Sequence, residues 1–343
     1  MTRLVQIQRG RERCVAVVVE PHVRLLTGTQ TIYELAQAAD IGGGSLAKVI
    51  QQRETEERLD YEPIYSAQSD WKLLPPVDHP GEPARGLVSG TGLTHLGSAK
   101  NRQAMQSGTG VPLVSDRQDA CATTDSMKMF RWGVEGGKPA PGKIGIAPEW
   151  FYKGNGTVLR AHGQPLEVPS FAEDGGEEAE IAGIYFIGAD GTPRRIGMAI
   201  GNEFSDHKFE KKNYLNLAGS KLRNCSLGPE LVVDPQFDSV PGNVAIIRAG
   251  KVVWSQDILT GENEMCHSLA NLEHHHFKFE AHRRPGDLHV HYFGACSLSF
   301  GAGIELADGD VMEISFRGFG RALRNPLRIQ RGESGLITVK PLS

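Results

Sequence analysis

Short apolar runs, separated by glycine, proline and polar residues, form the main pattern along the chain. Such runs, either continuous or alternating with polar residues, predict β-strands at residues 181–187, 195–201, 230–233, 244–248, 251–255, 287–293 and 311–316. Two further strands are expected within residues 1–30, where residues 14–19 give the clearest signal. Residues 31–39 and 45–58 have helical patterns, with Ser45 as the expected N-cap of the second helix. The pattern therefore predicts an α+β protein that is mainly β.

The length and composition of the chain agree with a large, loop-rich fold. Its 343 residues supply ample material for a hydrophobic core, and its 41 glycines and 19 prolines argue against a helical bundle. The segments Pro75-Pro76 and His79-Pro80-Gly81 are typical of a connection between domains. We therefore predict a small N-terminal α/β domain with its linker over residues 1–80, and a main domain over residues 81–343.

The charge and cysteine content narrow the range of partners and compartments. A formal net charge of −4, with both signs interspersed, argues against nucleic acid as a partner. No apolar run approaches the roughly 20 residues that span a bilayer, and the first residues lack a signal-peptide pattern, so no membrane association is expected. The cysteines are scattered, without CxxC spacing, at positions Cys14, Cys121, Cys225, Cys266 and Cys296. We expect reduced thiols and a cytoplasmic protein.

Three carboxylates and a lysine stand out within otherwise apolar or glycine-bearing sequence. Glu178 and Glu180 alternate with Ala179 ahead of an apolar run, and a strand places residues i and i+2 on one face, about 7 Å apart. Two inward glutamates repel each other unless a hard divalent cation neutralises them. Glu203 follows the next apolar run, and Lys221 comes after it. The pattern indicates metal-dependent chemistry on an oxygen-rich small molecule, and a solvated acidic strand face is the alternative for the E-x-E pair alone.

A series of short motifs follows one another over roughly residues 85–328. The segments are Pro148-Glu149-Trp150-Phe151-Tyr152-Lys153, Glu178-Ala179-Glu180, Gly201-Asn202-Glu203-Phe204-Ser205, Lys221 with Leu227-Gly228-Pro229, Pro285-Gly286-Asp287, Phe293-Gly294-Ala295, Asp308-Gly309-Asp310, and Gly320 with Leu323-Arg324-Asn325-Pro326. Their order and spacing resemble those of the fumarylacetoacetate hydrolase superfamily. Each motif is weak by itself, and their common order is what makes the resemblance strong.

The resemblance implies a fold, a cofactor and a set of site residues. The fold would be the superfamily's mixed β-sandwich roll, assembled as a homodimer. The metal would be Mg²⁺, with Mn²⁺ or Ca²⁺ as alternatives, and its ligands would be Glu178, Glu180 and Glu203. The positions that would contact the substrate are Lys153, Ser205, Gly294, Ala295 and Cys296. The residues that would carry catalysis are Lys221 and His95.

Three positions depart from the superfamily pattern. His95 stands where the superfamily has a histidine that activates water, but no glutamate follows three residues later to orient it. Glu203 replaces the usual aspartate and keeps its charge. Ala295 replaces a threonine that contacts the substrate carboxylate, so Cys296 or Ser297 would take over that contact. These differences disfavour plain hydrolysis and leave a hydrogen-bonded loop histidine as the alternative for His95.

Other polar clusters have weaker claims to a site. The run His274-His275-His276 is expected at a strand end or interface, because consecutive strand residues alternate faces and no further ligand follows at a zinc spacing. His289 and His291 share one strand face, where they either line the site or belong to the core or an interface. Arg283 and Arg284 are expected to be solvated loop charges, with a carboxylate-binding fork as the alternative.

Within the superfamily, the segment Gly261-Glu262-Asn263-Glu264-Met265-Cys266-His267-Ser268-Leu269 is most similar to bacterial sugar-acid proteins. Relatives of that type dehydrate 2-keto-3-deoxy-pentonates to 2-oxoglutarate semialdehyde in non-phosphorylative pentose breakdown. The resemblance therefore implies a metal-dependent hydro-lyase acting on a small 2-oxo sugar acid. Lys221 would take the C3 proton, its pKa depressed by burial and the nearby cation, and His95, or a water it holds, would protonate the departing C4 hydroxyl.

Three alternatives stay open at this point. A hydrolase would cleave the C–C bond of a 2,4-diketo-3-deoxy sugar acid to pyruvate, with His95 activating water. A decarboxylase or tautomerase would act on a dicarboxylic 2-oxo acid. A non-catalytic 2-oxo-acid-binding protein would explain the missing glutamate and Ala295. We rank the dehydratase first, because three acids and a lysine in this pattern are hard to explain without chemistry.

Overall fold

The computed structural model describes residues 1–107 and 124–342, so Cys121 lies outside the described residues. The helices are α1 (Ile32–Ile41), α2 (Leu46–Arg53), α3 (Tyr61–Tyr65), α4 (Leu96–Ser107), α5 (Asp125–Gly136), α6 (His207–Lys212), α7 (Leu217–Lys221) and α8 (Leu269–Phe277). Within the described ranges, none of the helices has the length and apolar character needed to cross a membrane.

Strands outnumber helices along the chain. They are β1 (Thr2–Arg9), β2 (Glu12–Val19), β3 (His22–Leu26), β4 (Glu54–Asp60), β5 (Lys72–Leu73), β6 (Gly86–Gly92), β7 (Glu149–Asn155), β8 (Leu159–Arg160), β9 (Leu166–Val168), β10 (Ala179–Ile187), β11 (Pro193–Asn202), β12 (Cys225–Leu227), β13 (Leu231–Val233), β14 (Val240–Arg248), β15 (Lys251–Thr260), β16 (Leu288–Tyr292), β17 (Val311–Phe316) and β18 (Leu323–Ile329). Strand makes up 35% and helix 25% of the structure, which confirms the predicted mainly-β α+β class.

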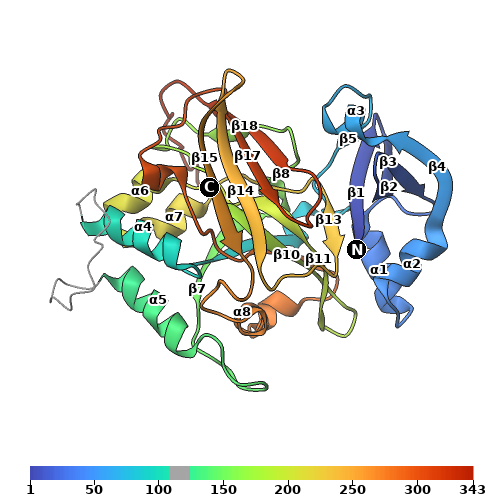
Figure 1. The fold of residues 1–343 in the computed structure, drawn as a ribbon, viewed down its shortest axis with the longest axis horizontal. Coiled ribbons are helices and arrows are strands. Elements are labelled where there is room, and N and C mark those ends of the chain that lie inside the picture. Colours follow the sequence, from blue (N-terminus) through green and yellow to red (C-terminus); the bar gives the residue numbers. More distant parts are fainter. Residues whose placement is uncertain (108–123, 343) are drawn as a thin grey trace.

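The N-terminal part is an antiparallel ribbon of β1 to β4 with α1 and α2 beside it (Figure 1). Three strands, not the two expected, occupy residues 1–30. Helix α1 begins at a capping box, in which the Thr31 side chain accepts a hydrogen bond from the Glu34 amide and the Glu34 carboxylate accepts one from the Thr31 amide. Ser45 is the N-cap residue of α2, as expected, but its side chain makes no capping hydrogen bond within the described structure.

The helix predicted over residues 45–58 is wrong in its second half. The helix ends at Arg53, and β4 follows it and pairs antiparallel with β3. The β4 side chains are polar and mostly exposed, so by themselves they resemble the solvated face of a helix. Their conformation is decided by pairing with the neighbouring strand, which the local sequence does not record.

A mixed sheet runs through the described part of the molecule in the strand order β4-β3-β2-β1-β13-β11-β10-β16-β6-β7 (Figure 1). Most neighbours along this path are antiparallel, whereas β16 and β6 are parallel. Strand β1 joins the N-terminal ribbon to the rest of the sheet by pairing with β13. The division into domains near residue 80 stays a prediction, and backbone hydrogen bonds link the two parts.

A second sheet, in the order β15-β14-β17-β18-β9, packs against one face of the central sheet. The two sheets meet in a hydrophobic cluster to which the central sheet contributes Ile181 and Ile200. The second sheet contributes Val244, Ile314 and Phe316 to the same cluster. This arrangement is a sandwich whose core lies between the two sheets.

Strand β10 lies near the middle of the central sheet and is buried on both faces. Ile181 faces the second sheet, whereas Ala182 and Ile184 face the cluster that α1 and α2 cover. A strand buried on both faces needs apolar residues at successive positions, which explains the continuous apolar run that predicted it. The other six strands predicted beyond residue 190 are also present, with somewhat different ends.

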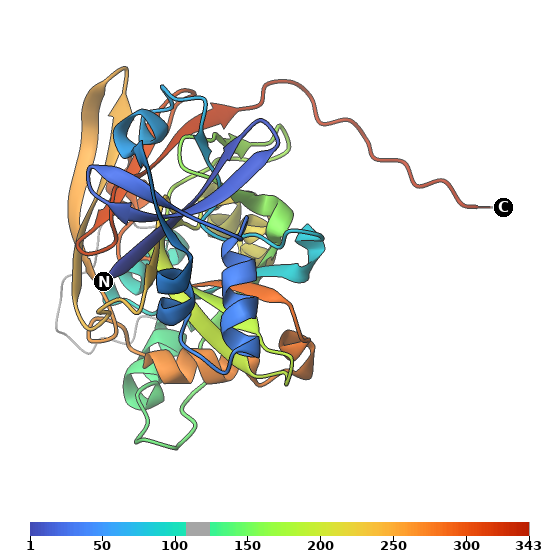
Figure 2. The same cartoon turned by 90° about the vertical axis from the view of Figure 1, so that its right-hand side faces the viewer.

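After β18 the chain leaves the body of the molecule as an extended segment (Figure 2). Its apolar side chains Leu336, Ile337 and Val339 are almost fully exposed. The segment therefore adds nothing to either hydrophobic layer of the sandwich.

Glu230 ties the N-terminal ribbon to the main part of the chain. This buried carboxylate accepts a hydrogen bond from the Tyr61 hydroxyl at 3.1 Å and lies 3.0 Å from Arg3 Nη1. Glu230→Ala removes the acceptor from both partners, so we expect a loss of about 1–3 kcal/mol in the free energy of unfolding, measured by urea denaturation. Glu12→Ala removes only an exposed ion pair with Arg9 and should leave the unfolding midpoint almost unchanged. Equal losses in the two variants would contradict this role of Glu230.

Candidate metal centre

The hairpin of β10 and β11 brings three glutamates together at the end away from its turn. Its register pairs Glu180 with Gly201. Glu178, just before β10, and Glu203, just after β11, therefore lie at the same end of the hairpin. The Glu203 amide donates a hydrogen bond to the Glu178 carbonyl oxygen at 3.0 Å. One carboxylate oxygen from each of Glu178, Glu180 and Glu203 lies within 4.8 Å of the others, and all three side chains are buried. We call these three residues the glutamate triad.

Asn202 fixes the backbone on both sides of the triad. Its Oδ1 atom accepts hydrogen bonds from the amides of Glu178, at 3.1 Å, and Phe204, at 3.2 Å. Phe204 has a φ of +26°, an uncommon value for a residue other than glycine, and it marks a sharp turn. The turn places Glu203 in the triad, while the Phe204 ring packs in the core beside β9 and β18.

Two buried lysines supply positive charge to the triad. Lys221, at the end of α7, forms ion pairs with Glu178 and, at 2.5 Å, with Glu203. Lys153, on β7, lies 2.6 Å from Glu203 Oε1 and donates to the carbonyl oxygens of Glu203 and, at 2.7 Å, Phe204. Lys221 therefore faces two carboxylates of the triad, whereas Lys153 holds the Glu203 turn in place.

Two more buried side chains border the triad. His207 Nε2 lies 3.2 Å from Glu178 Oε1, and His207 Nδ1 has no hydrogen-bond partner among the described residues. Glu177 precedes the triad in sequence but contacts a different group, because its carboxylate accepts hydrogen bonds from the Ser299 amide and hydroxyl, each at 2.7 Å. The alternative of a solvated acidic run therefore does not hold for Glu177, which is buried and hydrogen-bonded.

Glu180 is the member of the triad whose charge is least compensated. Burial, together with repulsion from Glu203 and Glu178, holds the pKa of Glu180 well above its usual range. Burial also acts to raise the pKa of Glu178, but the Lys221 ammonium group outweighs it and holds that pKa well below its usual range. Among the described residues, no lysine or arginine forms an ion pair with Glu180, which accepts a hydrogen bond from the Gly294 amide at 2.6 Å.

The expectation that the pKa of Lys221 is depressed is wrong for the protein by itself. Burial acts to lower this pKa, but the adjacent carboxylates of Glu178 and Glu203 outweigh burial and raise it. The sequence-based expectation included burial and a nearby cation, and it left out the two carboxylates that contact the ammonium group.

The triad fits a hard divalent cation. Metal–oxygen distances of about 2.0–2.6 Å place two ligands of one ion at most about 5 Å apart. The ligand oxygens of the triad satisfy that limit, because they lie within 4.8 Å of one another. Three carboxylates face two lysines, and the uncompensated charge is concentrated on Glu180. An all-oxygen set suits Mg²⁺, Mn²⁺ or Ca²⁺, and binding would relieve the repulsion that raises the pKa of Glu180.

Two of the expected substrate positions contact the triad itself. The Ser205 hydroxyl donates to Glu203 Oε1 at 3.2 Å, and the Gly294 amide donates to Glu180 Oε2 at 2.6 Å. Gly294 has a φ of +102°, and a Cβ atom added there would lie 2.0 Å from Thr94 Oγ1. Glycine is therefore favoured at this position, because other residues rarely adopt this φ and a side chain would collide with Thr94.

The remaining expected substrate positions surround the triad in different ways. Ala295 lines a cavity beside it. Burial raises the pKa of Cys296 to about 11, so this thiol is neutral near pH 7. Lys153 is fully buried and is already paired with Glu203. Their contact with a substrate stays a prediction.

His95 immediately precedes α4 and is buried. The Thr94 hydroxyl donates to the Phe293 carbonyl oxygen, which makes it the acceptor in its 2.9 Å contact with His95 Nδ1. This assigns the proton to Nδ1, and His95 Nε2 then accepts a hydrogen bond from the Thr260 hydroxyl at 3.1 Å. Burial lowers the pKa of His95 to about 4, so the ring is neutral near pH 7. Among the described residues, threonine hydroxyls and no carboxylate orient this histidine.

A cavity of about 20 Å³ lies beside the triad, with room for about one water molecule. Its wall includes Ser98, Arg102, His207 and Glu210, which the sequence analysis did not identify as site residues. The sequence positions of three of these residues do point to the site. His207 comes two residues after the Gly201–Ser205 turn, and Ser98 and Arg102 have the i, i+4 spacing of one helical face.

The three consecutive histidines lie on helix α8, so the expectation of a strand end is wrong. Helical geometry turns His276 inward, where its Nε2 atom lies 2.9 Å from His289 Nδ1. His289 and His291 do share a face of β16, and both rings lie against the His276 ring. Among the described residues, the glutamate triad is the one group of three His, Cys, Asp or Glu side chains whose possible metal-ligand atoms converge. The three buried histidines, His276, His289 and His291, are therefore assigned to the core. The expected loop arginines ahead of β16 are both exposed, but Arg283 is the last residue of a 3₁₀ helix, Glu280–Arg283, and Arg284 follows it.

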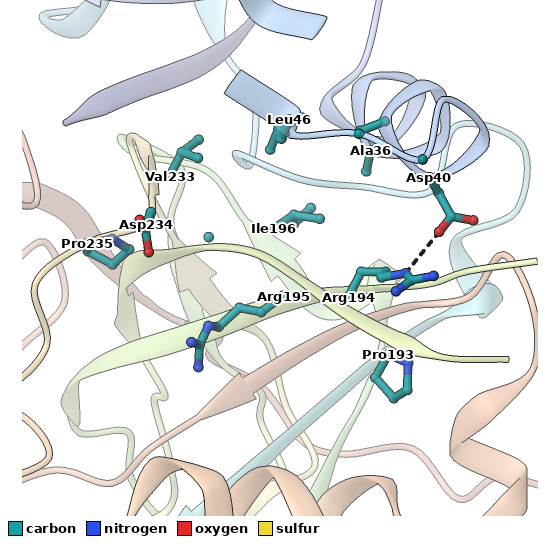
Figure 3. A pocket seen from close by; sticks show the side chains of 14 residues that line it. Ala36, Asp40, Leu46, Pro193, Arg194, Arg195, Ile196, Val233, Asp234 and Pro235 are labelled. Carbon is teal, nitrogen blue, oxygen red and sulfur yellow. Dashed lines mark hydrogen bonds and ion pairs between the residues drawn. The ribbon is translucent and has the colours of Figure 1, made fainter. Parts of the chain in front are cut away.

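A larger cavity, of about 640 Å³, lies between helices α1 and α2 and strand β11 (Figure 3). Arg194 and Arg195 line it, and their guanidinium groups are already paired, with Asp40 at 3.0 Å and Glu273 at 2.6 Å. This cavity borders the first half of β11, whereas the triad lies beyond the other end of that strand. The described residues offer no second group of convergent metal ligands there, so the triad is the better candidate for a catalytic site.

No protein-family model and no curated protein matches the chain in sequence. Solved structures do match its fold. A 2-keto-3-deoxy-D-arabinonate dehydratase complexed with magnesium and 2,5-dioxopentanoate matches with a TM-score of 0.69 and 18% identity, over 96% of this chain and 100% of that chain. A 5-carboxymethyl-2-hydroxymuconate delta-isomerase from Mycobacterium smegmatis has a TM-score of 0.55 and 16% identity, with 96% and 100% covered. A 2-hydroxyhepta-2,4-diene-1,7-dioate isomerase from Mycobacterium marinum has a TM-score of 0.56 and 16% identity, with 96% and 99% covered.

The chain therefore has the fold of the fumarylacetoacetate hydrolase superfamily, as the sequence motifs predicted. At 16–18% identity, the likeness shows the fold alone. The reaction has to be argued from the residues of the site.

Glu180→Gln separates metal binding from folding. The substitution removes a buried, repelled carboxylate and keeps an acceptor for the Gly294 amide, so the metal-free variant should be at least as stable as the wild type. The wild type should gain about 2.7 kcal/mol of stability at a Mg²⁺ or Mn²⁺ concentration of a hundred times Kd. The variant should lose most of that gain, as measured by thermal unfolding with the metal and with EDTA.

Glu177→Gln is the matched control for that measurement. Glu177 is equally buried but contacts Ser299 instead of the triad, so its variant should respond to metal like the wild type. A full metal response in Glu180→Gln would exclude Glu180 as a ligand.

Proposed function

We propose that this protein is a metal-dependent dehydratase that converts a 2-keto-3-deoxy-pentonate to 2-oxoglutarate semialdehyde (2,5-dioxopentanoate) in non-phosphorylative pentose catabolism. The observation that carries the proposal is the convergence of the buried triad with the Lys221 ammonium group. A protein of the same fold is a 2-keto-3-deoxy-D-arabinonate dehydratase complexed with magnesium and 2,5-dioxopentanoate, which supports this chemistry. Mg²⁺ is our first choice of metal, and a cytoplasmic homodimer is part of the same proposal.

Lys221 is the proposed base for the C3 proton. A divalent cation bound by the triad would supply Lewis-acid polarisation of the substrate's 2-oxo group. Lys221 contacts two of the three carboxylates, so its amine lies next to the place where the acidified C3 position would be held. The same carboxylates raise the pKa of Lys221, and sharing their charge with a cation weakens that effect. The proposed base is the neutral amine of Lys221, and this weakening favours that form.

The proposed reaction removes one water from the five-carbon acid. Lys221 takes a proton from C3, the C4–O bond breaks, and the hydroxide leaves with a proton as water. The new C3=C4 double bond shifts to C4=C5 when C5 loses a proton and Lys221 returns one to C3, and the resulting enol becomes the aldehyde. His95 is neutral with Nε2 as an acceptor, so a water that it orients would donate the proton to the leaving hydroxide, and the hydroxide formed from that water would take the C5 proton.

One observation favours hydrolysis of a 2,4-diketo-3-deoxy sugar acid as the second candidate. A neutral imidazole with an unprotonated Nε2 atom is the form that activates water, and His95 has that form. Hydrolysis needs this base directly, so His95→Ala should abolish C–C cleavage, whereas a dehydratase should keep part of its rate. We rank hydrolysis second because threonines, and no described carboxylate, orient the ring.

Lys221→Met should reduce dehydratase turnover by about 10²–10⁴-fold, because it removes the proposed base. The assay offers D- and L-2-keto-3-deoxypentonate and a 2,4-diketo-3-deoxy acid with Mg²⁺, and mass spectrometry detects a product lighter by one water. EDTA should abolish the signal. Lys251→Met, at an exposed lysine on β15, is the control and should keep wild-type turnover.

Each result of this assay has a distinct meaning. Wild-type turnover in Lys221→Met would show that another group is the base. Cleavage of the diketo acid to pyruvate would establish the hydrolase instead. A wild-type protein that turns over none of the three acids would favour a non-catalytic 2-oxo-acid-binding protein.

A further inference from the structure

A second group of charged side chains borders the small cavity beside the triad. Arg102, on α4, donates to both carboxylate oxygens of Glu149, at 2.6 and 2.8 Å, and its Nε atom lies 2.8 Å from Glu210 on α6. The Tyr214 hydroxyl also donates to Glu149, at 3.1 Å. The side chains of Arg102, Glu149 and Glu210 are at most 11% exposed. This group is a built feature of the interior and not a set of solvated surface charges.

The group carries a net negative charge. One guanidinium faces two carboxylates, so its positive charge is already neutralised and one negative charge is left over. Ser98 lies one helical turn before Arg102 and adds an uncharged hydroxyl to the same cavity wall. One part of the cavity wall thus consists of triad residues, and another part consists of Ser98, Arg102 and Glu210.

We propose that Ser98, Arg102 and Glu210, with Glu149 paired to Arg102 outside the cavity wall, form a hydroxyl-recognising subsite, which accepts the uncharged, hydroxyl-bearing end of a 2-oxo acid and rejects a second carboxylate. The inference rests on the proposed function, because that function places the substrate's own carboxylate and 2-oxo group at the triad. The other end of the chain then faces the remaining cavity wall.

The chemistry of hydrogen bonding explains this preference. The Ser98 hydroxyl already donates to the His95 carbonyl oxygen at 3.1 Å, so it acts as an acceptor toward a ligand. A substrate hydroxyl can donate to Ser98 or to the Glu210 carboxylate and accept from Arg102, so every partner is satisfied. A carboxylate has no hydrogen to donate, and it would be repelled by Glu149 and Glu210 in a water-poor environment. The subsite would therefore exclude dicarboxylic 2-oxo acids, which are the substrates that a decarboxylase or tautomerase of this type would need.

The test compares two five-carbon ligands that share the 2-oxo carboxylate and differ at C5. 5-Hydroxy-2-oxopentanoate has an uncharged hydroxyl there, and 2-oxoglutarate has a carboxylate. Neither has a C4 hydroxyl to eliminate, so binding is measured apart from turnover. Isothermal titration calorimetry on the full chain with Mg²⁺ should give an affinity for the hydroxy acid at least about tenfold tighter than for 2-oxoglutarate.

Two variants assign the preference to the subsite. Glu210→Gln removes one negative charge and should tighten 2-oxoglutarate binding. The ratio of the affinity for the hydroxy acid to that for 2-oxoglutarate should therefore fall several-fold. Ser98→Ala keeps the charge and should weaken only the hydroxy acid, so it tests the subsite even if Glu210→Gln does not fold. Glu313→Gln is the control, because Glu313 also pairs with an arginine, Arg324, but lies on β17 away from the cavity, and its ratio should equal that of the wild type.

The outcomes separate this inference from the proposed reaction. Equal affinities for the two acids in the wild type, or unchanged ratios in both folded variants, would overturn the subsite whether or not the protein is a dehydratase. A clear preference for the hydroxy acid without turnover of any pentonate would support the subsite and reject only the reaction. Failure of both acids to bind with Mg²⁺ would overturn the subsite together with the 2-oxo-acid site.

Discussion

Repulsion between three carboxylates buried side by side is the constraint around which this site is organised. Lys221 bridges Glu178 and Glu203, and Lys153 adds a second positive charge at Glu203. Glu180 has a backbone amide as its donor and no cationic partner among the described residues. A buried charge without a partner is strongly unfavourable, so an unpaired buried carboxylate points to a ligand that compensates its charge. A divalent cation is the ligand that fits the oxygens' spacing and the charge left over.

The fold meets that constraint by joining segments that are far apart in the sequence. The β10–β11 hairpin aligns the triad through its register, and strand β7 and helix α7 each bring one lysine to it. Helices α4 and α6 then close the cavity and add a second, mixed-charge group centred on Arg102. Because both groups are buried, each charge acts strongly on the others and little on bulk solvent. The two groups together line one cavity, with the triad on one part of its wall and Arg102 and Glu210 on another.

The sequence predicted the elements whose signals are local. The apolar run of β10, the E-x-E pair and the turn carrying Glu203 are all recognisable from the sequence alone, and the same pattern predicts the strands after residue 190. Errors arose where a partner in space decides the conformation. Residues 54–60 resemble a polar helix and become a strand by pairing with β3. The three consecutive histidines were placed on a strand end, but they lie on helix α8 and turn His276 into the core.

By itself, the sequence determined the class of fold, the nature of the candidate ligands and their places next to two successive strands, because these depend on side-chain periodicity and on neighbours within a few residues. Only the tertiary structure decided the electrostatics. The pKa of Lys221 is raised and not lowered, His95 is held neutral by burial, and Arg102 is paired with two glutamates. Each of these results depends on distances between groups that are remote in sequence and on how completely they are shielded from water. Coulomb and desolvation energies follow those distances and that shielding, and no local pattern in the sequence specifies either.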